Sequence, residues 1–141
     1  MTSGLIALAA VLAVAVVTGV AWQRSNGRIR AVREGNTVAV PSLTSAQLGR
    51  PLGDRATLVQ FSSAFCAPCR ATRRILAEVA SMVDGVAHVE IDAEAHLDLV
   101  RSLDIRRTPT VLVLDPDGRI ARRASGQPRK ADVIAALGEV G

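Results

Sequence analysis

The chain has 141 residues, a formal net charge of +4, two cysteines, one tryptophan, two phenylalanines and no tyrosine. This length leaves room for one folded domain. Four arginines and one glutamate fall in residues 23–35, so most of the net positive charge belongs to this short segment. Because the rest of the chain is nearly neutral and lacks the aromatic side chains on which bases stack, we do not expect it to bind nucleic acid.

The N-terminal segment is predicted to be a transmembrane anchor. Gly4 to Trp22 carries no charged residue and consists mostly of Ala, Val, Leu and Ile. As a helix it would span about 28 Å, close to the thickness of the hydrocarbon core of a bilayer. The alternative is a cleaved secretory signal, with Gly19 and Ala21 at the cleavage site, but Met1-Thr2-Ser3 has no basic residue. A buried helix of a soluble domain is disfavoured because the segment is apolar all round.

Arginines follow the apolar segment at once, at positions Arg24, Arg28, Arg30 and Arg33. They can meet anionic headgroups, so the lipid bilayer is an expected partner. Since all the nearby positive charge lies C-terminal to the span, the positive-inside rule places residues 23–141 in the cytoplasm. The extracytoplasmic side stays open, because a single span with a short uncharged tail can insert either way. The expected organisation is an anchor over residues 1–22, a basic tether over 23–36 and one domain over 37–141.

The first half of the domain is predicted to lead into a buried strand. Thr37–Val40 is expected to form a short first strand, Ser42–Leu48 one or two helical turns, and Gly49–Asp54 a loop. Thr57–Phe61 is continuously apolar except for Gln60, as in a central strand that is buried on both faces.

The second half is predicted to alternate helices and strands. Apolar residues at helical spacing predict a helix from Cys66 to about Met82, ended by Asp84-Gly85. A strand is expected at Val86–Ile91, followed by a helix at Glu94–Leu103 with Leu97, Val100 and Leu103 facing inward. Thr110–Leu114 and Arg119–Ala124 are expected to form a hairpin around the turn Asp115-Pro116-Asp117-Gly118. A last helix is expected at Arg129–Val140. This order predicts an α/β fold with a mixed sheet covered by helices on both faces.

The chemistry of the chain is predicted at its only two cysteines, Cys66 and Cys69. Three residues apart on the first turn of a helix, their side chains share one face and can close a disulfide. The unpaired N–H groups and the dipole at that helix end favour the thiolate of Cys66, which is the attacking species in disulfide exchange. We therefore predict a thiol–disulfide oxidoreductase. A zinc site would need His88 and His96, whose spacing does not suit one, and a purely structural disulfide would constrain little chain.

Several further motifs accompany the cysteines in residues 37–141. They are the apolar strand running into Phe65-Cys66-Ala67-Pro68-Cys69-Arg70, the strand end Val89-Glu90-Ile91-Asp92, the segment Ile105-Arg106-Arg107-Thr108-Pro109-Thr110, the Asp-Pro-Asp-Gly hairpin, and Gly126 before the last helix. In these motifs the chain resembles the thioredoxin superfamily. The resemblance implies a thioredoxin-like three-layer fold, preceded here by one N-terminal transmembrane helix.

The resemblance also implies roles for particular residues. Cys66 is implied to be the exposed nucleophile, and Cys69 to resolve the mixed disulfide with the substrate. Pro109 is implied to form a cis peptide bond beside the disulfide, and Thr108 to offer its backbone to an extended substrate strand. The substrate-binding site is completed by Phe65, Ala67 and Pro68. No bound cofactor and no metal are implied.

The implied partners are protein disulfide substrates and an upstream electron donor, such as a thioredoxin reductase or a membrane thiol carrier, with the chain itself a monomer. Two alternatives differ in role. One is an extracytoplasmic thioredoxin-like protein that serves cytochrome maturation or other secreted thiols. The other is a non-catalytic binding module that holds a partner through the face around Pro109.

The chain departs from the pattern of the family at two places. Gln60 stands where the family often has a buried aspartate that helps to deprotonate the resolving thiol, and an amide cannot act as a base. His88 and Glu90 on the neighbouring strand are candidates to replace that acid. Ser62 and Phe65 stand where thioredoxins usually carry tryptophan, although Phe65 still supplies an apolar lip beside the first cysteine.

Arginines are frequent near the cysteine pair in the sequence, at positions Arg70, Arg73, Arg74, Arg106 and Arg107. If they surround the thiol, they stabilise its thiolate and favour acidic partners. The alternative is an arginine-rich surface that only meets solvent.

Overall fold

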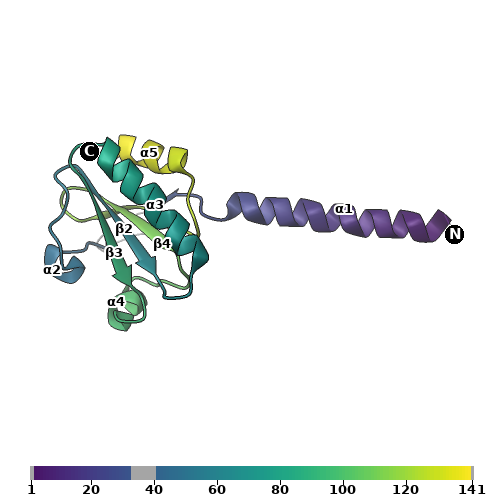
Figure 1. Cartoon of the computed structure of the whole chain (residues 1–141), viewed down its shortest axis with the longest axis horizontal. Coiled ribbons are helices and arrows are strands. Elements are labelled where there is room, and N and C mark those ends of the chain that lie inside the picture. The colour runs from purple at the N-terminus through teal and green to yellow at the C-terminus, as the bar shows by residue number, and fades with distance from the viewer. Residues whose placement is uncertain (1, 33–40, 141) are drawn as a thin grey trace.

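The computed structural model of the protein describes residues 2–32 and 41–140. A long exposed helix, α1 (Thr2–Ser25), extends away from a domain built around one mixed sheet (Figure 1). In the described part of the chain the sheet has five strands in the order β1-β5-β4-β2-β3. These strands are β1 (Arg30–Ala31), β2 (Ala56–Ser62), β3 (Val86–Asp92), β4 (Thr110–Leu114) and β5 (Ile120–Ser125).

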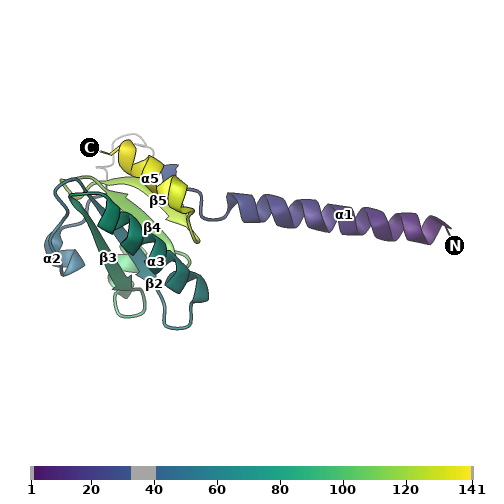
Figure 2. The same ribbon diagram turned by 45° about the horizontal axis from the view of Figure 1, so that its top comes forward.

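Helices cover both faces of the sheet, as predicted. On one face lie α3 (Ala67–Met82) and α5 (Lys130–Gly138), and on the other the short helices α2 (Ser45–Leu48) and α4 (Leu97–Ser102) (Figure 2). All seven residues of β2 are buried, which confirms that this strand runs through the middle of the sheet. Leu58 packs under α3 and α5, whereas Val59 and Phe61 belong to the core on the other face.

The strand pairing brings three chain segments together at one edge of the sheet. β2 runs parallel to β3 and antiparallel to β4, so Phe61 lies opposite both Ile91 and Thr110. The chain therefore leaves β2 and enters β4 at the same edge. The loop that contains the cysteines and the loop that contains Pro109 are neighbours for this reason.

The hairpin between β4 and β5 has the turn that its sequence predicts. The side chain of Asp115 accepts hydrogen bonds from the backbone N–H groups of Asp117 and Arg119, each at 2.9 Å. Gly118 closes the turn at φ +83°, a region that disfavours other residues, and a Cβ there would clash with the carbonyl oxygen of Leu43.

The predicted helix at Glu94–Leu103 is shorter than expected, because α4 begins only at Leu97. Asp92 holds the preceding residues in a turn: its carboxylate accepts from the N–H of Glu94, and its carbonyl oxygen lies 3.0 Å from Nδ1 of His96. The prediction that Leu97 faces inward is wrong, since this side chain is 52% exposed, whereas Leu103 is buried.

The segment predicted as a tether, residues 23–36, is partly structured. Its first residues continue α1 to Ser25, and Arg30–Ala31 joins the sheet as β1. Between them, the N–H of Gly27 donates to the carbonyl oxygen of Ser125 at 2.8 Å. The end of α1 is therefore attached to the domain. The first strand predicted at Thr37–Val40 lies outside the described residues, and the proposed domain boundaries stay predictions.

Candidate active site

Cys66 and Cys69 form a disulfide at the start of α3, with their Cα atoms 5.2 Å apart. Cys66 is the N-cap residue, and its Sγ accepts a hydrogen bond from the backbone N–H of Cys69 at 3.2 Å. A helix start leaves such N–H groups without partners inside the helix, so a thiolate formed at Cys66 would be stabilised there. Pro68 fits the same turn because a residue in the first helical turn needs no N–H.

Both cysteines are buried in the disulfide form, so the expectation that Cys66 is exposed is wrong for this state. Cys69 is 1% exposed and Cys66 is 8% exposed, so the disulfide reaches solvent only at the side of Cys66. Phe65, which precedes it, is fully exposed, and Ala67 and Pro68 are exposed as well. The three residues predicted to bind substrate thus surround the accessible end of the disulfide with apolar surface.

The loop before β4 lies beside the cysteine loop, and the Thr108–Pro109 peptide bond is cis. Hydrogen bonds on both sides of the cis bond hold this loop. The hydroxyl groups of Ser63 and Thr108 are 2.9 Å apart, and the N–H of Gly126 donates to the carbonyl oxygen of Pro109 at 2.7 Å. Sequence reasoning did not single out Ser63, and no motif or spacing indicates its contact with a residue 45 positions away.

Gln60 is fully buried next to Cys69. Its Nε2 donates to the carbonyl oxygen of Cys69 at 2.8 Å and to the hydroxyl group of Ser62 at 2.9 Å. Its Oε1 is buried and has no hydrogen-bond partner among the described residues. The position that the family resemblance assigns to an acid is therefore occupied by a neutral donor that touches the backbone of the second cysteine.

The two candidates for a replacement acid or base, Glu90 and His88, have other surroundings. The carboxylate of Glu90 pairs with Arg73 through both oxygens, at 2.5 and 2.6 Å, and this pairing raises the pKa of Arg73. Burial lowers the pKa of His88, and its Nε2 has no partner among the residues the structure describes. Within those same residues, no group of three or more His, Cys, Asp or Glu side chains is arranged to hold a metal ion.

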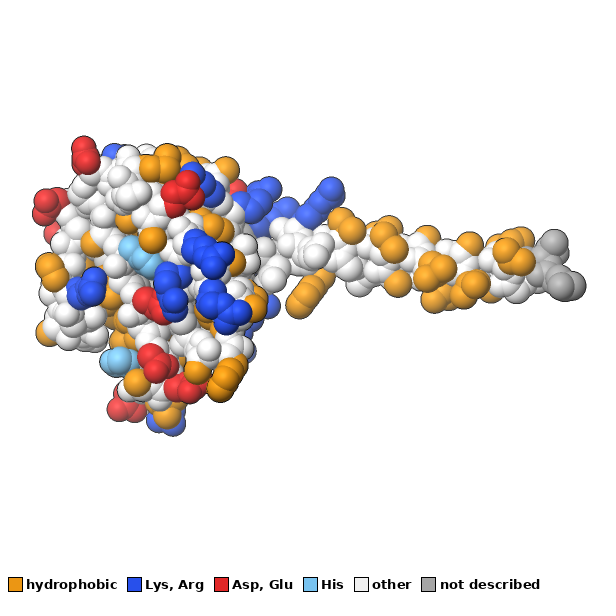
Figure 3. All heavy atoms as spheres, viewed as in Figure 1, with side chains coloured by type: hydrophobic (Ala, Val, Ile, Leu, Met, Phe, Trp, Pro, Cys, Tyr) orange, Lys and Arg blue, Asp and Glu red, His pale blue; other side chains and the backbone are white. Residues whose placement is uncertain are grey.

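The arginines near the cysteines do not form one group. Arg106 pairs with Asp104, and Arg107 donates to the side chain of Asn26 and to the carbonyl oxygen of Ser125. Arg70 and Arg74 are exposed on α3 and make no ion pair within the described ranges. Figure 3 shows basic side chains on the face that α3 covers and others where α1 meets the domain.

A Cys-x-x-Cys disulfide at the start of a helix, in a mixed sheet with helices on both faces, is an arrangement suited to thiol–disulfide exchange. Comparison with known proteins identifies the family. The model of the thioredoxin family matches residues 41–139. The chain belongs to the thioredoxin family, and the resemblance inferred from its motifs is confirmed.

Individual relatives agree with this assignment. The thioredoxin of Alicyclobacillus acidocaldarius subsp. acidocaldarius is 30% identical over 104 residues, which cover 72% of this chain and 98% of the relative. Thioredoxin H5 of Oryza sativa subsp. japonica is 26% identical over 51% of this chain, which spans only about half of that relative (53%). Among solved structures, chloroplastic thioredoxin z superposes with a TM-score of 0.58 at 28% identity, covering 74% of this chain and 96% of the other.

Proposed function

We propose that this protein is a membrane-tethered thiol–disulfide oxidoreductase that reduces disulfide bonds in protein substrates. The observation that supports this most directly is the Cys66–Cys69 disulfide, which reaches solvent only through Cys66 and whose Cys66 sulfur accepts a hydrogen bond from the N–H of Cys69. Exposed apolar residues around it, with Phe65 foremost, suit a protein substrate.

The proposed reaction begins with both cysteines reduced. The thiolate of Cys66 attacks one sulfur of the substrate disulfide, which forms a mixed disulfide and releases the other substrate sulfur as a thiolate. The Cys69 sulfur, after losing its proton, then attacks Sγ of Cys66. This step forms the Cys66–Cys69 disulfide and releases the second substrate thiol. The substrate gains two electrons and two protons, and an upstream donor must reduce the protein again.

The roles of the cysteines can be separated with two serine variants of the full chain. Cys69→Ser should accumulate mixed disulfides with substrate proteins, whereas Cys66→Ser should form none and should have no reductase activity. Cys66→Ser with wild-type activity would contradict the proposal. The direction of the reaction follows from the reduction potential of the pair: a value near about −270 mV is typical of a reductase, and one near about −120 mV of an oxidant.

The membrane part of the proposal is supported by α1. Its candidate span, Ser3–Ser25, is long and apolar enough to cross a bilayer, and the described helix is exposed along its length. An uncleaved anchor is favoured over a signal sequence because the helix continues to Ser25 and Gly27 then bonds to Ser125 in the sheet. The arginines that follow α1 favour the cytoplasmic side for the domain, by the positive-inside rule.

This topology can be tested with single cysteines in a Cys66→Ser, Cys69→Ser background. Ser81→Cys places the thiol at an exposed position of α3 in the domain, and Ser3→Cys places it at the N-terminal end of α1. In intact cells, a thiol reagent that cannot cross membranes should label Ser3→Cys and leave Ser81→Cys unlabelled. The reverse pattern would place the domain outside, and loss of the N-terminal residues from the isolated protein would indicate a cleaved signal.

The attachment of α1 also bears on the electron donor. Asn26, one residue after α1, accepts a hydrogen bond from Arg107, two residues before Pro109 in the loop beside the cysteines. The end of the anchor and the proposed substrate loop are therefore in contact. If α1 spans the membrane, this contact keeps the loop beside the cysteines close to the bilayer, which favours a membrane thiol carrier as the donor over a soluble thioredoxin reductase. Reduction of the purified full chain by each donor distinguishes them.

A further inference from the structure

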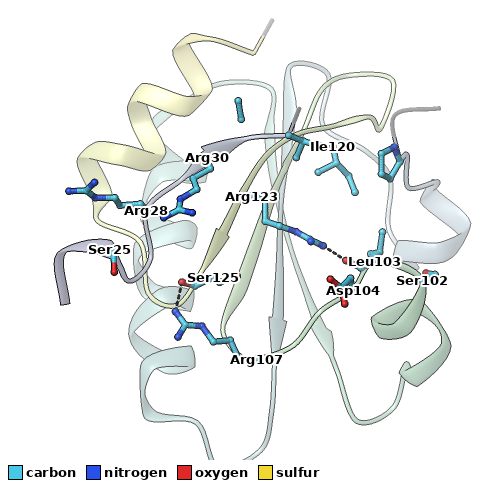
Figure 4. Close-up of a pocket in the computed structure, with 13 residues that line it drawn as sticks. Ser25, Arg28, Arg30, Ser102, Leu103, Asp104, Arg107, Ile120, Arg123 and Ser125 are labelled. Carbon is cyan, nitrogen blue, oxygen red and sulfur yellow. Dashed lines mark hydrogen bonds between the residues drawn. The ribbon is translucent and has the colours of Figure 1, made fainter. Parts of the chain in front are cut away.

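A cavity of about 650 Å³ lies at the junction of α1 and the domain, on the face of the sheet away from α3 and α5 (Figure 4). Part of its wall is apolar and includes Leu103 and Ile120. Four arginines from three segments of the chain also line it: Arg28, Arg30, Arg107 and Arg123. Among the described lining residues Asp104 is the only acid, and it pairs with Arg106.

Two of these arginines are direct cross-strand neighbours. Arg30 of β1 is the register partner of Arg123 of β5, so both side chains project from the same face of the sheet. Like charges at directly opposite positions destabilise a strand pair. Figure 4 shows their guanidinium groups directed to opposite sides of the cavity, so an anion in the cavity would have a positive charge on either side.

The positive charge in the cavity is not compensated within the described residues. Arg123 donates to the carbonyl oxygen of Leu103, and Arg107 donates only to neutral oxygens of Asn26 and Ser125. Arg122, the neighbour of Arg123 on the other face of the sheet, instead pairs with the carboxylate of Glu139 at 2.5 Å. Of these two neighbouring arginines, only Arg122 has an acidic partner in the described part of the chain.

The position of the cavity suggests the source of the anion. α1 has 24 residues and is about 36 Å long, slightly more than the roughly 30 Å hydrocarbon core of a bilayer. Its last residue, Ser25, lines the cavity. If α1 spans the membrane, the mouth of the cavity lies at the level of the lipid headgroups.

We propose that this cavity binds a phosphate ester, the headgroup of an anionic phospholipid. The phosphate would lie in the cavity with Arg30 on one side and Arg123 on the other, their long side chains turning toward it from the positions that Figure 4 shows, and the apolar part would lie against Leu103 and Ile120. A single guanidinium group can bind two phosphate oxygens at once. The choice of a lipid over a soluble phosphate ester rests on the proposed anchor, whereas the anion site itself does not.

The proposal is tested with the full chain in a nonionic detergent, titrated separately with phosphatidylglycerol, phosphatidylcholine and glycerol 3-phosphate. Phosphatidylglycerol should bind more tightly than phosphatidylcholine. Arg30→Gln and Arg123→Gln should each weaken its binding about fivefold, the effect of one basic residue near an anionic surface. Arg30 is exposed and makes no hydrogen bond through its side chain within the described residues, so this variant should fold even if Arg123→Gln does not.

Two variants with the same change of charge serve as controls. Arg24→Gln removes a charge from the end of α1 outside the cavity, and Arg119→Gln removes one from the β4–β5 turn. Neither should change the affinity for phosphatidylglycerol. If Arg24→Gln weakened lipid binding as much as the cavity variants, the lipid would be held by a diffuse basic surface, and the cavity proposal would be wrong. Binding that does not depend on Arg30 and Arg123 would also contradict the proposal.

The remaining outcomes distinguish a lipid from a soluble phosphate ester, and the cavity proposal from the proposed redox function. Arginine-dependent binding of glycerol 3-phosphate without a preference for the lipid would support the anion site and assign it a soluble ester. No binding of either anion would overturn it. Disulfide reductase activity, measured on the same Arg30 and Arg123 variants, should stay unchanged, so a failure of the cavity proposal is distinguishable from a failure of the proposed redox function.

Discussion

The Nε2 atom of Gln60 lies 2.8 Å from the carbonyl oxygen of Cys69 and fixes a neutral amide against the second cysteine of the pair. Gln60 and Cys69 are both buried, so this contact takes place away from solvent. A carboxylate at this position could take the proton of the Cys69 thiol, whereas the amide only donates. The proposed second step of the reaction must therefore lose its proton by another route.

Replacing this amide by an acid should accelerate that second step. Gln60→Asp and Gln60→Asn have the same size and differ in whether position 60 can accept a proton. We expect Gln60→Asp to resolve a preformed mixed disulfide about a hundredfold faster than Gln60→Asn, the lower end of general-base effects. The measurement is the rate of substrate release from a mixed disulfide with Cys66, as a function of pH.

The same pair of variants makes a prediction about stability. Burial should raise the pKa of a carboxyl group at position 60 above its ordinary value of about 3.9, because the charged form is desolvated. The folded state then keeps its proton to higher pH than the unfolded state does, so stability is lost as pH rises through the folded-state pKa. Denaturant unfolding should show Gln60→Asp losing stability relative to Gln60→Asn between acidic and alkaline pH. Parallel curves for the two variants would contradict this account.

Glu90→Gln should leave the resolving step unchanged within about twofold. The Glu90 carboxylate pairs with Arg73 at the surface through both oxygens, which leaves it poorly suited to accept a proton from Cys69. The same release assay decides this, with Arg73→Gln as the variant that frees the carboxylate. A tenfold slower release in Glu90→Gln would restore Glu90 as the base.

His88 should make the domain less stable in mild acid. Burial lowers the pKa of His88 below its ordinary value of 6.5; nearby Arg73 and Arg50 act in the same direction, and Glu90 opposes them. At pH values between 6.5 and the lower pKa of the folded state, His88 is protonated more in the unfolded chain than in the folded one. Stability contributed by neutral His88 is therefore present above pH 6.5 and falls as the pH decreases through the folded-state pKa.

His88→Gln should flatten this dependence. The check is urea unfolding of the full chain in detergent, followed by circular dichroism at pH 7.5 and about pH 5. His96→Gln is the matched control, since the ring of His96 is exposed at the start of α4. An unchanged acid dependence in His88→Gln would show that other groups cause it.

Phe65→Ala should weaken the reaction with proteins and spare the reaction with small disulfides. Phe65 is fully exposed beside Cys66, so its removal leaves the core unchanged, but an apolar contact with a protein substrate is lost. We expect kcat/KM for insulin reduction to fall about tenfold, which corresponds to about 1.4 kcal/mol of transition-state binding. The rate with a small aromatic disulfide should change less than twofold. Met82→Ala, exposed at the far end of α3, is the control and should affect neither substrate.

The elements that sequence reasoning predicted well are those with a strong local pattern. The apolar run Thr57–Phe61 became the fully buried strand β2, and the residues from Cys66 to Met82 became α3 with its N-cap. The prediction for Glu94–Leu103 was wrong at its start, because the Asp92 carboxylate accepts a hydrogen bond from the N–H of Glu94 and holds the following residues in a turn. A periodic pattern of apolar residues does not reveal such a competing side-chain contact.

Some residues of the candidate site could also be predicted from local sequence, and others could not. Cys66, Cys69, Pro68 and Phe65 lie together because they are neighbours in the chain, and the motif alone was enough to find them. The cis bond before Pro109 was expected from the family resemblance and is present. Ser63 was missed, since its contact with Thr108 depends on the pairing of β2 with β4.

By itself, the sequence determined an apolar N-terminal helix, a central buried strand and a pair of cysteines at a helix start that can form a disulfide. Each of these follows from composition or spacing within about twenty residues, and local physics is enough to specify them. Only the tertiary structure decided that Gln60 touches Cys69, that Asn26 binds the loop before Pro109, and that Arg30 lies opposite Arg123. These contacts join residues far apart in the chain. They depend on strand register and on the packing of whole elements, which no local pattern encodes.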